Sequence, residues 1–385
     1  MKKICLFIAA SAGVAIATSA WSSEEGLTDD KIVLGATMPL TGGPGLLGYA
    51  SMLGEKMAIA EINQAGGING RLLELRVEDD AYVPSTGVQM LQKLLDNGIF
   101  GYLPASGGSH LFAQLPLIDE AELPTINTVV TTAKHYDPPH PSFFAFGMTY
   151  ADGAYALLSR LDALHPGLKW GYVVQDDESG EDRVAGWRKA AGDLGLELVS
   201  EQKFKRGQAD FSAEILRARE AGVEGLLLGG LPGDNASMIK EMERLDMNVV
   251  RGTLWVDHIP PMFDLTGPAG DGLYVYDYLP SLSDDPRLEE FNALALKVLS
   301  PDDLKRVNRY SVGAYLSTKL LASAIETCGE NVTRACVNKN LEDTIDFETS
   351  GITSSISFGA GQRMSHQKGH LLRIDTSKRA FLPVE

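Results

Sequence analysis

The chain has little cysteine, with three residues in 385, and it has no excess of positive charge, since its formal net charge is −17 at pH 7. An acidic balance of this size argues against nucleic acid and anionic lipid as partners. No Walker-type lysine loop occurs. The carboxylate clusters at Asp79-Asp80 and Asp176 to Glu178 have no histidine, cysteine or lysine at a recognisable catalytic spacing. The sequence therefore predicts no cofactor, and it offers no positive sign of catalysis.

The first 20 residues have the pattern of a targeting segment. Lys2 and Lys3 supply the charged start, Ile4 to Ala17 is apolar, and Thr18 to Ala20 offers the small residues that a signal peptidase requires. The apolar run is short for a membrane span, so we expect a cleaved signal peptide rather than a retained anchor. Cys5 comes too early for a lipoprotein cleavage site. We expect a soluble protein exported to the periplasm, with a mature net charge of −19 after loss of the two lysines.

Two cysteines remain after that cleavage, Cys328 and Cys336, which stand eight positions apart between two helical patterns. An even number of cysteines in an exported protein favours a disulfide. Free thiols and a metal-binding pair are the alternatives, although no histidine stands at a matching distance nearby. We expect a structural disulfide.

The stretch from Ile32 to Asp80 predicts the first unit of the fold. Ile32 to Met38 is apolar without alternation, which is typical of a strand buried on both faces of a parallel sheet. A glycine-rich loop from Thr41 to Gly48 follows, then a helical pattern that ends at Ala65-Gly66-Gly67, then a strand from Leu72 to Val77. Ligands of such folds bind at the carboxyl ends of the strands, so we expect the site in these loops.

This opening resembles that of the periplasmic solute-binding proteins of ABC importers, in the class that includes the leucine/isoleucine/valine-binding proteins. The matching pattern is PLTGG, then AIAEINQAGGINGR in the helix, then a strand that ends VEDD. The similarity continues along the mature chain through looser motifs. It implies a type I periplasmic binding protein, which is a monomeric receptor without cofactor or metal that delivers a small molecule to a permease in the inner membrane.

Strand and helix patterns alternate along the rest of the chain. A helix is expected from about Pro84 to Asp96, with proline in its first turn, and strands are expected at Trp170 to Val174 and Gly225 to Leu228. This alternation predicts an α/β fold with doubly wound, Rossmann-like parallel sheets. About 365 mature residues exceed what one hydrophobic core usually serves, so we expect two lobes.

No linker marks where the lobes divide, so the division comes from the resemblance. Proteins of this class cross between their lobes three times, which makes a three-segment hinge with a cleft beside it. The matching crossings here are 147–150, 278–281 and 354–358. They give an N-terminal lobe of 24–147 plus 281–353 and a C-terminal lobe of 148–280 plus 354–385.

The segment ASGGS, Ala105 to Ser109, is the first candidate for ligand contact. It precedes a helix, and its amides and the Ser106 and Ser109 hydroxyls can face an anionic group together. Ser109 could equally serve as the helix cap. The resemblance implies that this loop and residues 128–132 hold one end of the ligand, and the residues it places there are Leu47, Ala105, Ser106, Gly107, Val130, Thr131 and Thr132.

From the other lobe, the resemblance points to the segments around Ser179, Leu231 and Trp255-Val256-Asp257. Amino-acid binders of the family hold the ammonium group with an acidic residue near the last position, where this chain has Asp257; an exposed loop aspartate is the alternative. Ser179 and Leu231 stand where those binders have aromatic residues, which argues against an aliphatic amino acid.

Aromatic residues in the same region suggest a different ligand. Trp255 and Tyr150, together with Phe146, are candidates for the floor of a pocket that takes an aromatic or planar molecule. The alternative for each of them is a place in the core of a lobe.

His366 and His370 in HQKGH have a spacing that metal sites also use. Gly369 between them argues against a helix that would bring both rings to one face. We expect a polar hairpin here and no metal.

These observations support a periplasmic substrate-binding component of an ABC importer, which closes by hinge motion on a small organic solute such as an amino acid, an aromatic carboxylate or an amide. A ligand-sensing receptor subunit would use the same pocket. An exported α/β enzyme is a further alternative, because the fold alone does not exclude one. It would require a catalytic constellation in the cleft, and we expect no enzyme.

Overall fold

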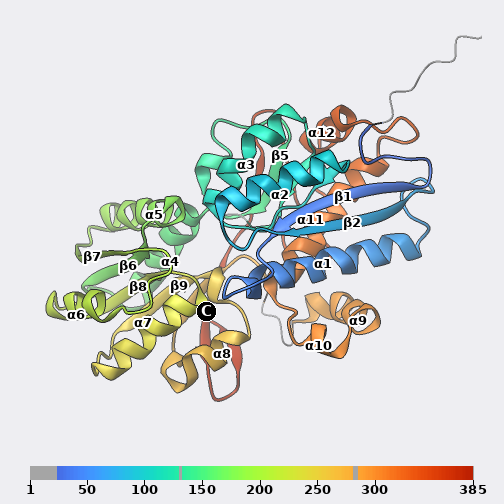
Figure 1. Ribbon diagram of the computed structural model, residues 1–385. Coiled ribbons are helices and arrows are strands. Elements are labelled where there is room, and N and C mark those ends of the chain that lie inside the picture. Colours follow the sequence, from blue (N-terminus) through green and yellow to red (C-terminus); the bar gives the residue numbers. More distant parts are fainter. Residues whose placement is uncertain (1–23, 130–131, 281–284, 385) are drawn as a thin grey trace, which may run out of the picture.

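The computed structural model describes residues 24–129, 132–280 and 285–384. It shows two α/β lobes that lie next to each other, each built around its own sheet (Figure 1). The expected signal peptide, Cys5, Val130 and Thr131 lie outside the described residues. Within those ranges, no helix combines the length and apolar character that crossing a membrane demands.

The first sheet has six strands in the order β11-β5-β4-β3-β1-β2, and every neighbouring pair is parallel. Alternate residues of the first strand face opposite helix layers. Val33 packs with Leu91 and Leu111, whereas Leu34 packs with Met57 and Leu320. The strands are β1 Lys31–Met38, β2 Leu72–Asp79, β3 Gly101–Tyr102, β4 Thr125–Asn127, β5 Phe143–Gly147 and β11 Met364–His366; the helices are α1 Gly45–Gln64, α2 Pro84–Asp96, α3 Gly108–Glu120, α9 Glu289–Val298, α10 Pro301–Leu304, α11 Arg309–Glu326 and α12 Arg334–Glu342.

The second sheet has seven strands in the order β13-β12-β10-β9-β8-β6-β7. Its five strands from β6 to β10 are parallel, and β12 and β13 add an antiparallel hairpin at one edge. The strands are β6 Trp170–Gln175, β7 Leu198–Phe204, β8 Gly225–Gly229, β9 Val250–Leu254, β10 Tyr274–Asp277, β12 His370–Asp375 and β13 Ala380–Pro383; the helices are α4 Tyr150–Leu164, α5 Glu178–Leu194, α6 Ser212–Glu220, α7 Pro232–Arg244 and α8 Pro261–Thr266. The expected α/β class with two doubly wound lobes is confirmed.

The chain changes sheets after β5, after β10 and after β11. The third change falls later than the predicted crossing at 354–358. Strand β11 pairs in parallel with Ala145 to Gly147, and the Phe358 ring packs on Phe144 with centroids 5.2 Å apart. Residues up to His366 thus belong with the first sheet. The HQKGH segment passes between the lobes, and the expectation of a polar hairpin there was wrong.

Helices α1 and α11 approach closely because Gly54 has no side chain. A Cβ at Gly54 would lie only 2.0 Å from the carbonyl oxygen of Ser311. The Ser311 hydroxyl donates to the carbonyl oxygen of Ala50 at 2.7 Å across the same crossing. This contact fixes the start of α11, and with it the position of Tyr310 next to the interlobe cavity described below.

The expected disulfide is present. Cys328 and Cys336 are bonded and close the loop between α11 and α12. The bond joins the end of one helix of the first lobe to the start of the next, so its role is structural.

Replacement of both cysteines by serine is expected to lower the free energy of unfolding by roughly 2–3 kcal/mol, because a loop of this length gains that much entropy in the unfolded chain when it is opened. Urea denaturation of the double variant and of the oxidised wild type measures the difference. The reduced wild type is the control and should match the variant. Equal stability of the variant and the oxidised protein would contradict this expectation.

Candidate functional site

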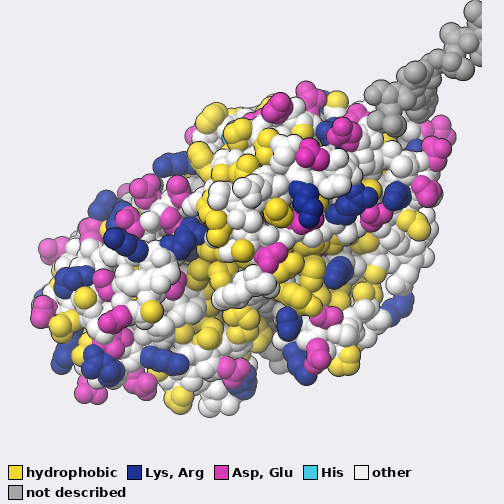
Figure 2. All heavy atoms as spheres, in the orientation of Figure 1, with side chains coloured by type: hydrophobic (Ala, Val, Ile, Leu, Met, Phe, Trp, Pro, Cys, Tyr) yellow, Lys and Arg dark blue, Asp and Glu magenta, His cyan; other side chains and the backbone are white. Residues whose placement is uncertain are grey.

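A cavity lies between the lobes, at the carboxyl ends of the strands of both sheets. The cavity has a volume of about 40 Å³. In the space-filling view, apolar side chains gather along the boundary between the lobes (Figure 2). The first lobe lines the cavity with Pro39, Leu47, Tyr82, Ala105, Ser106, Gly107, Val129 and Tyr310, and the second lobe with Tyr150, Gln175, Asp177, Ser179, Arg183, Gly229, Gly230, Leu231 and Val256.

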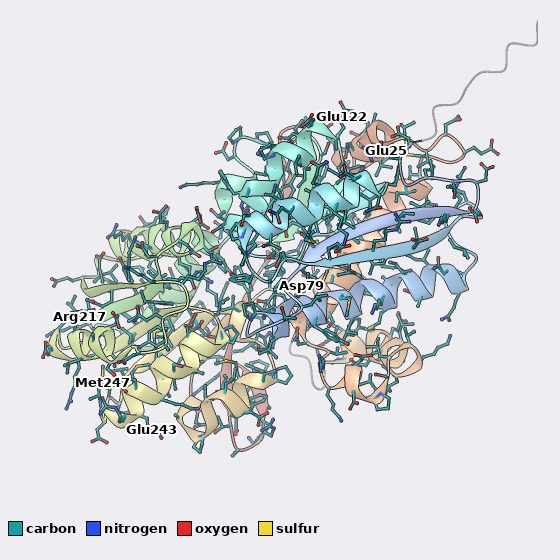
Figure 3. All side chains as sticks on the ribbon, viewed as in Figure 1. Glu25, Asp79, Glu122, Arg217, Glu243 and Met247 are labelled. Atoms are coloured by element: carbon teal, nitrogen blue, oxygen red, sulfur yellow. A yellow bond between two sulfur atoms is a disulfide. The ribbon has the colours of Figure 1, made fainter. Side chains whose placement is uncertain are left out.

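The loops of the first lobe are held by a carboxylate at the end of β2. Asp79 is labelled in Figure 3. It accepts hydrogen bonds from the amide of Leu40 at 3.0 Å, the hydroxyl of Thr41 at 2.9 Å and the amide of Ala81 at 2.8 Å. These bonds hold the pKa of Asp79 below its ordinary value, although burial works in the opposite direction. Asp79 therefore joins the glycine-rich loop to the turn that presents Tyr82.

Tyr150, the first residue of α4, lies between a cation and an indole. The guanidinium carbon of Arg183 is 3.5 Å from the centre of the Tyr150 ring, and Trp255 stacks on it with centroids 5.1 Å apart. Two groups at these separations cannot share one face, so both faces of Tyr150 are covered. Burial raises the pKa of Tyr150, and Arg183 opposes that shift. A ligand in the cavity thus meets the edge of this ring, not its face.

Arg183 brings a positive charge to the wall of the cavity. Its side chain is 4% exposed, and its Nη1 donates to the carbonyl oxygen of Ser179 at 3.2 Å. The Cδ atom packs against Gly229, where a Cβ would come within 3.2 Å. Its Nε has no hydrogen-bond partner within the described part of the chain.

Asp177, the other charged residue of the wall, is fully engaged. It caps α5 by accepting from the amide of Gly180 at 2.9 Å, and its second oxygen accepts from Arg206 at 3.0 Å and from Gln175. Arg206 also lies over the ring of Tyr82, 4.8 Å from its centre. The charge of Asp177 is therefore balanced within the protein.

Contacts across the mouth hold the two lobes together. Ser109 donates to the carboxylate of Glu178 at 2.6 Å, and Thr132 donates to Asp182 at 3.2 Å. In both contacts the first lobe meets the start of α5 on the second. The Ser109 hydrogen bond lowers the pKa of Glu178. The cavity is thus covered, and the lobes stand in a closed arrangement.

Some of the predicted contact residues line the cavity, and others do not. Those that line the cavity are Leu47, Ala105, Ser106, Gly107, Tyr150, Ser179 and Leu231. Thr132 instead joins the lobes through Asp182, and Trp255 lies behind Tyr150. Val130 and Thr131 are outside the described residues. Phe146 packs in the core of the first lobe.

Asp257 is neither an exposed loop residue nor part of the cavity wall. It is fully buried in the short turn after β9 and accepts a hydrogen bond from Asn235 at 2.7 Å. Burial raises the pKa of Asp257 to about 7. Its role toward an ammonium group stays a prediction.

Several residues of the wall were not predicted from the sequence, among them Tyr82, Gln175, Arg183 and Tyr310. Arg183 left a recognisable signal, because it stands four positions after Ser179 and residues so spaced share one face of a helix. However, a charged residue on a helix is ordinarily exposed to solvent, so the sequence gives no reason to expect that Arg183 is buried.

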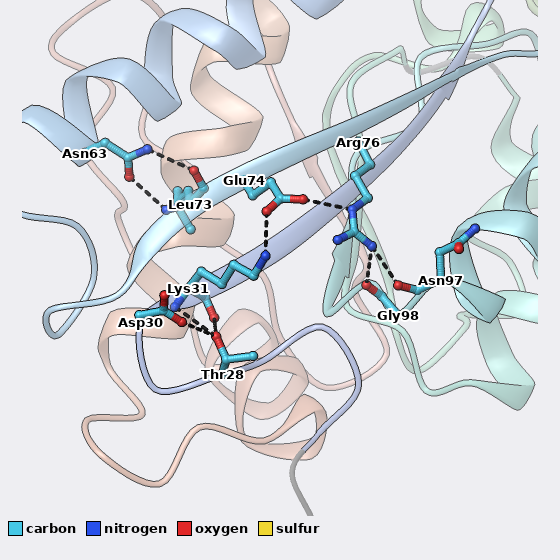
Figure 4. A network of polar contacts seen from close by, with 9 residues as sticks. All are labelled: Thr28, Asp30, Lys31, Asn63, Leu73, Glu74, Arg76, Asn97 and Gly98. Carbon is cyan, nitrogen blue, oxygen red and sulfur yellow. Dashed lines mark hydrogen bonds and ion pairs between the residues drawn. The ribbon is translucent and has the colours of Figure 1, made fainter.

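Charged side chains also gather on the outer strand of the first sheet, at the ends of β1 and β2 remote from the cavity (Figure 4). The Glu74 carboxylate pairs with Lys31 and with Arg76, at 2.9 Å each. The Asn63 side chain bonds both the amide and the carbonyl oxygen of Leu73. Such side chains protect an edge strand from pairing with another chain, so this cluster is structural.

The two histidines of HQKGH fall in different sheets. Nδ1 of His366 lies 3.5 Å from a carboxylate oxygen of Asp152 in the other lobe, while His370 begins β12 in the second sheet. Among the residues that the structure describes, no group of three or more histidine, cysteine, aspartate or glutamate side chains is arranged to hold a metal ion.

Comparisons with known proteins give the same picture. The model of the family described as "Periplasmic binding protein" matches residues 31–379. The "Leu/Ile/Val-binding protein homolog 1" of Brucella abortus is 22% identical over 335 residues, which cover 84% of each chain. A branched-chain amino acid ABC transporter protein of Thermus thermophilus, solved with valine, has a TM-score of 0.83 at 21% identity and covers 93% of this chain and 96% of its own. A fatty acid ABC transporter substrate-binding protein of Thermomonospora curvata has a TM-score of 0.83 at 23% identity, with 94% and 93% covered.

Proposed function

This chain belongs to the periplasmic binding protein family, and we propose that it serves an ABC importer by capturing a small organic molecule in the cavity between its lobes. The resemblance that rested on PLTGG and AIAEINQAGGINGR is thereby confirmed. The observation that carries the proposal is the closed cavity itself, which both lobes line at the carboxyl ends of their strands. A wall shared by two lobes couples ligand binding to closure, because only the closed form contacts the ligand from both sides.

The partners follow from the family. Its members bind small molecules and work with a membrane permease, and the protein is accordingly exported to the periplasm. We propose in addition that the first 20 residues are removed on export and that the mature protein acts as a monomer. The family consists of substrate-binding proteins, and we propose that this chain catalyses no reaction.

For ligand contact we propose the predicted residues that reach the cavity, namely Leu47, Ala105, Ser106, Gly107, Tyr150, Ser179 and Leu231. One of the related structures holds valine, and the other is named as the substrate-binding protein of a fatty acid ABC transporter. At this level of identity their likeness concerns the fold, so the ligand must be argued from the cavity.

A thermal-shift screen of the mature protein tests the function. A compound at about 100 times its dissociation constant should raise the free energy of unfolding by about 2.7 kcal/mol, which is readily seen as a higher melting temperature. Uptake of the same compound by cells should be lost when the gene is deleted. Conversion of a bound compound into a product would contradict the proposal.

Glu178→Ala is expected to weaken ligand binding roughly 3- to 10-fold, because it removes a partly exposed, charged hydrogen bond that forms only when the lobes close. Isothermal titration calorimetry with a hit from the screen measures the change. Glu220→Ala, at the exposed end of α6, is the matched control and should bind like the wild type. Unchanged affinity in Glu178→Ala would show that the contact with Ser109 does not stabilise the closed state.

A further inference from the structure

The wall of the cavity carries one charge that the described residues do not balance. Of its two charged side chains, Asp177 is paired with Arg206. Among the described residues, Arg183 forms no ion pair with a carboxylate: it donates to the carbonyl oxygen of Ser179, its guanidinium lies over the Tyr150 ring, and its Nε has no hydrogen-bond partner. Burying a cation without a negatively charged counterpart costs free energy. Binding of an anion would reduce that cost.

Within the part of the chain that the structure describes, three side chains of the wall also have buried polar atoms without a hydrogen-bond partner. They are Nε of Arg183, the hydroxyl of Tyr310 and the hydroxyl of Ser106, and the three residues are 4%, 1% and 3% exposed. Buried polar groups in proteins are nearly always hydrogen-bonded. All three can donate, and they reach the cavity from both lobes. An acceptor-rich ligand group would satisfy them together.

Among the described residues, the wall offers an ammonium group no carboxylate that is free to pair with it. Both oxygens of Asp177 already accept hydrogen bonds. Asp80 and Asp257 are fully buried and do not line the cavity. Asp80 accepts from the amide of Tyr82 and Asp257 from Asn235, and the second oxygen of each has no partner among the described residues. The chemistry of the wall therefore favours an anion over a zwitterion.

The rest of the wall sets the character of the ligand body. Leu47, Val129, Leu231 and Val256 are aliphatic, and both faces of Tyr150 are already covered by Arg183 and Trp255. The body thus packs against aliphatic side chains and ring edges.

Resting on the function proposed above, we propose that the ligand is an organic carboxylate without an α-ammonium group, and that Arg183 binds its carboxylate while Ser106 and Tyr310 donate further hydrogen bonds. Arg183 suits this task because its planar fork of N–H groups matches the two oxygens of a carboxylate. Closure brings this cation from the second lobe to the two hydroxyls of the first. A negatively charged ligand group therefore stabilises the closed state more than a neutral group of the same shape does.

The test uses matched sets of compounds on the mature protein. Each set has one carbon skeleton as the acid, the primary amide and the α-amino acid, for example 4-methylpentanoate, 4-methylpentanamide and leucine, or 3-phenylpropanoate, 3-phenylpropanamide and phenylalanine. Thermal shift and then calorimetry give the affinities. We expect the acid of a binding set to bind about 10- to 100-fold more tightly than its amide or amino acid.

Arg183→Gln should lower the affinity for the acid by the same factor and leave the affinity for the amide unchanged, so that the preference disappears. Arg183→Lys keeps the charge and should retain part of the preference, which covers the case in which the glutamine variant does not fold. The control is Arg188→Gln on the same helix, because Arg188 pairs at the surface with Glu201. It should change nothing.

The outcomes separate the inference from the function on which it rests. Tighter binding of the amino acids, or an equal loss of acid and amide in Arg183→Gln, would overturn the inference and leave the solute receptor intact. If the folded wild type binds no compound of any set, nor any compound of the broader screen, the proposed function fails and the inference falls with it.

Discussion

Asp277→Asn is expected to destabilise the protein by about 3–5 kcal/mol, because it leaves a buried arginine without its counter-charge. Asp277 ends β10 and is fully buried. It receives two hydrogen bonds from Arg309 of the first lobe, at 2.6 and 2.9 Å, and shares one with His258 at 2.6 Å. The pair therefore ties the second sheet to α11 where the chain returns to the first lobe.

The loss of stability in Asp277→Asn should be larger near neutral pH than in acid. Burial alone would raise the pKa of Asp277, but Arg309 and the His258 hydrogen bond outweigh it and hold the pKa below its ordinary value. A lowered pKa in the folded state stabilises the fold at pH values above the ordinary carboxyl pKa, and this contribution is lost as the pH falls through the folded-state pKa. The difference between wild type and Asp277→Asn should thus be full near neutral pH and should shrink in acid.

Urea denaturation at several pH values checks both statements. Asp264→Asn is the matched control, because Asp264 also makes two hydrogen bonds to an arginine, Arg379, but at the exposed surface. Exposed pairs contribute about 0–1 kcal/mol. Equal losses in the two variants would show that burial of the Asp277 pair does not set its effect.

Trp255→Ala is expected to lower the free energy of unfolding by about 3–5 kcal/mol, as truncation of a fully buried tryptophan does, and to weaken ligand binding as well. The Trp255 indole stacks on Tyr150, and a Cβ on Gly153 would lie 2.5 Å from its ring. Without the indole, Tyr150 loses the support that holds its edge toward the cavity. Denaturation and calorimetry, done well below the melting temperature of the variant, measure the two effects separately.

The control for Trp255→Ala is Trp187→Ala. Trp187 is also fully buried and stacks on a tyrosine, Tyr172, with centroids 5.3 Å apart, but it does not line the cavity and does not contact Tyr150 as Trp255 does. It should cost similar stability and leave ligand affinity within about a factor of two. Normal ligand binding by Trp255→Ala would mean that Tyr150 is held by Arg183 alone.

The elements that the sequence predicted well are those with a strong local pattern. The helix expected from Pro84 to Asp96 has those bounds in the structure, and the strand expected at Trp170 to Val174 ends one residue later. The apolar runs of buried parallel strands and the proline of a first helical turn are local signals. Ser106 and Gly107, which the family resemblance placed at the ligand, do line the cavity, and their contact with a ligand stays a prediction.

What escaped prediction depends on contacts between distant residues. Arg183 is on a helix whose charged residues mostly face solvent, and only the packing of α5 against Tyr150 and Gly229 turns it inward. Asp257 follows a strand, but the turn after β9 directs it to Asn235 rather than to the cavity. Strand β11 has three residues, too few for a recognisable pattern, and its partner β5 ends at residue 147.

The late position of β11 in the chain affects the order in which the two sheets can be completed. All five parallel strands of the second sheet, β6 to β10, lie between residues 170 and 277 and leave the ribosome before residues 364–366 are made. The first sheet begins earlier, yet it waits for almost the whole chain before its last strand is available. A protein truncated shortly before residue 364 would therefore be able to complete neither sheet, since β12 and β13 are missing as well. Among the strand edges that a later strand covers, the edge of β5 waits longest during synthesis, and a chaperone or an aggregating neighbour can pair with it in that time.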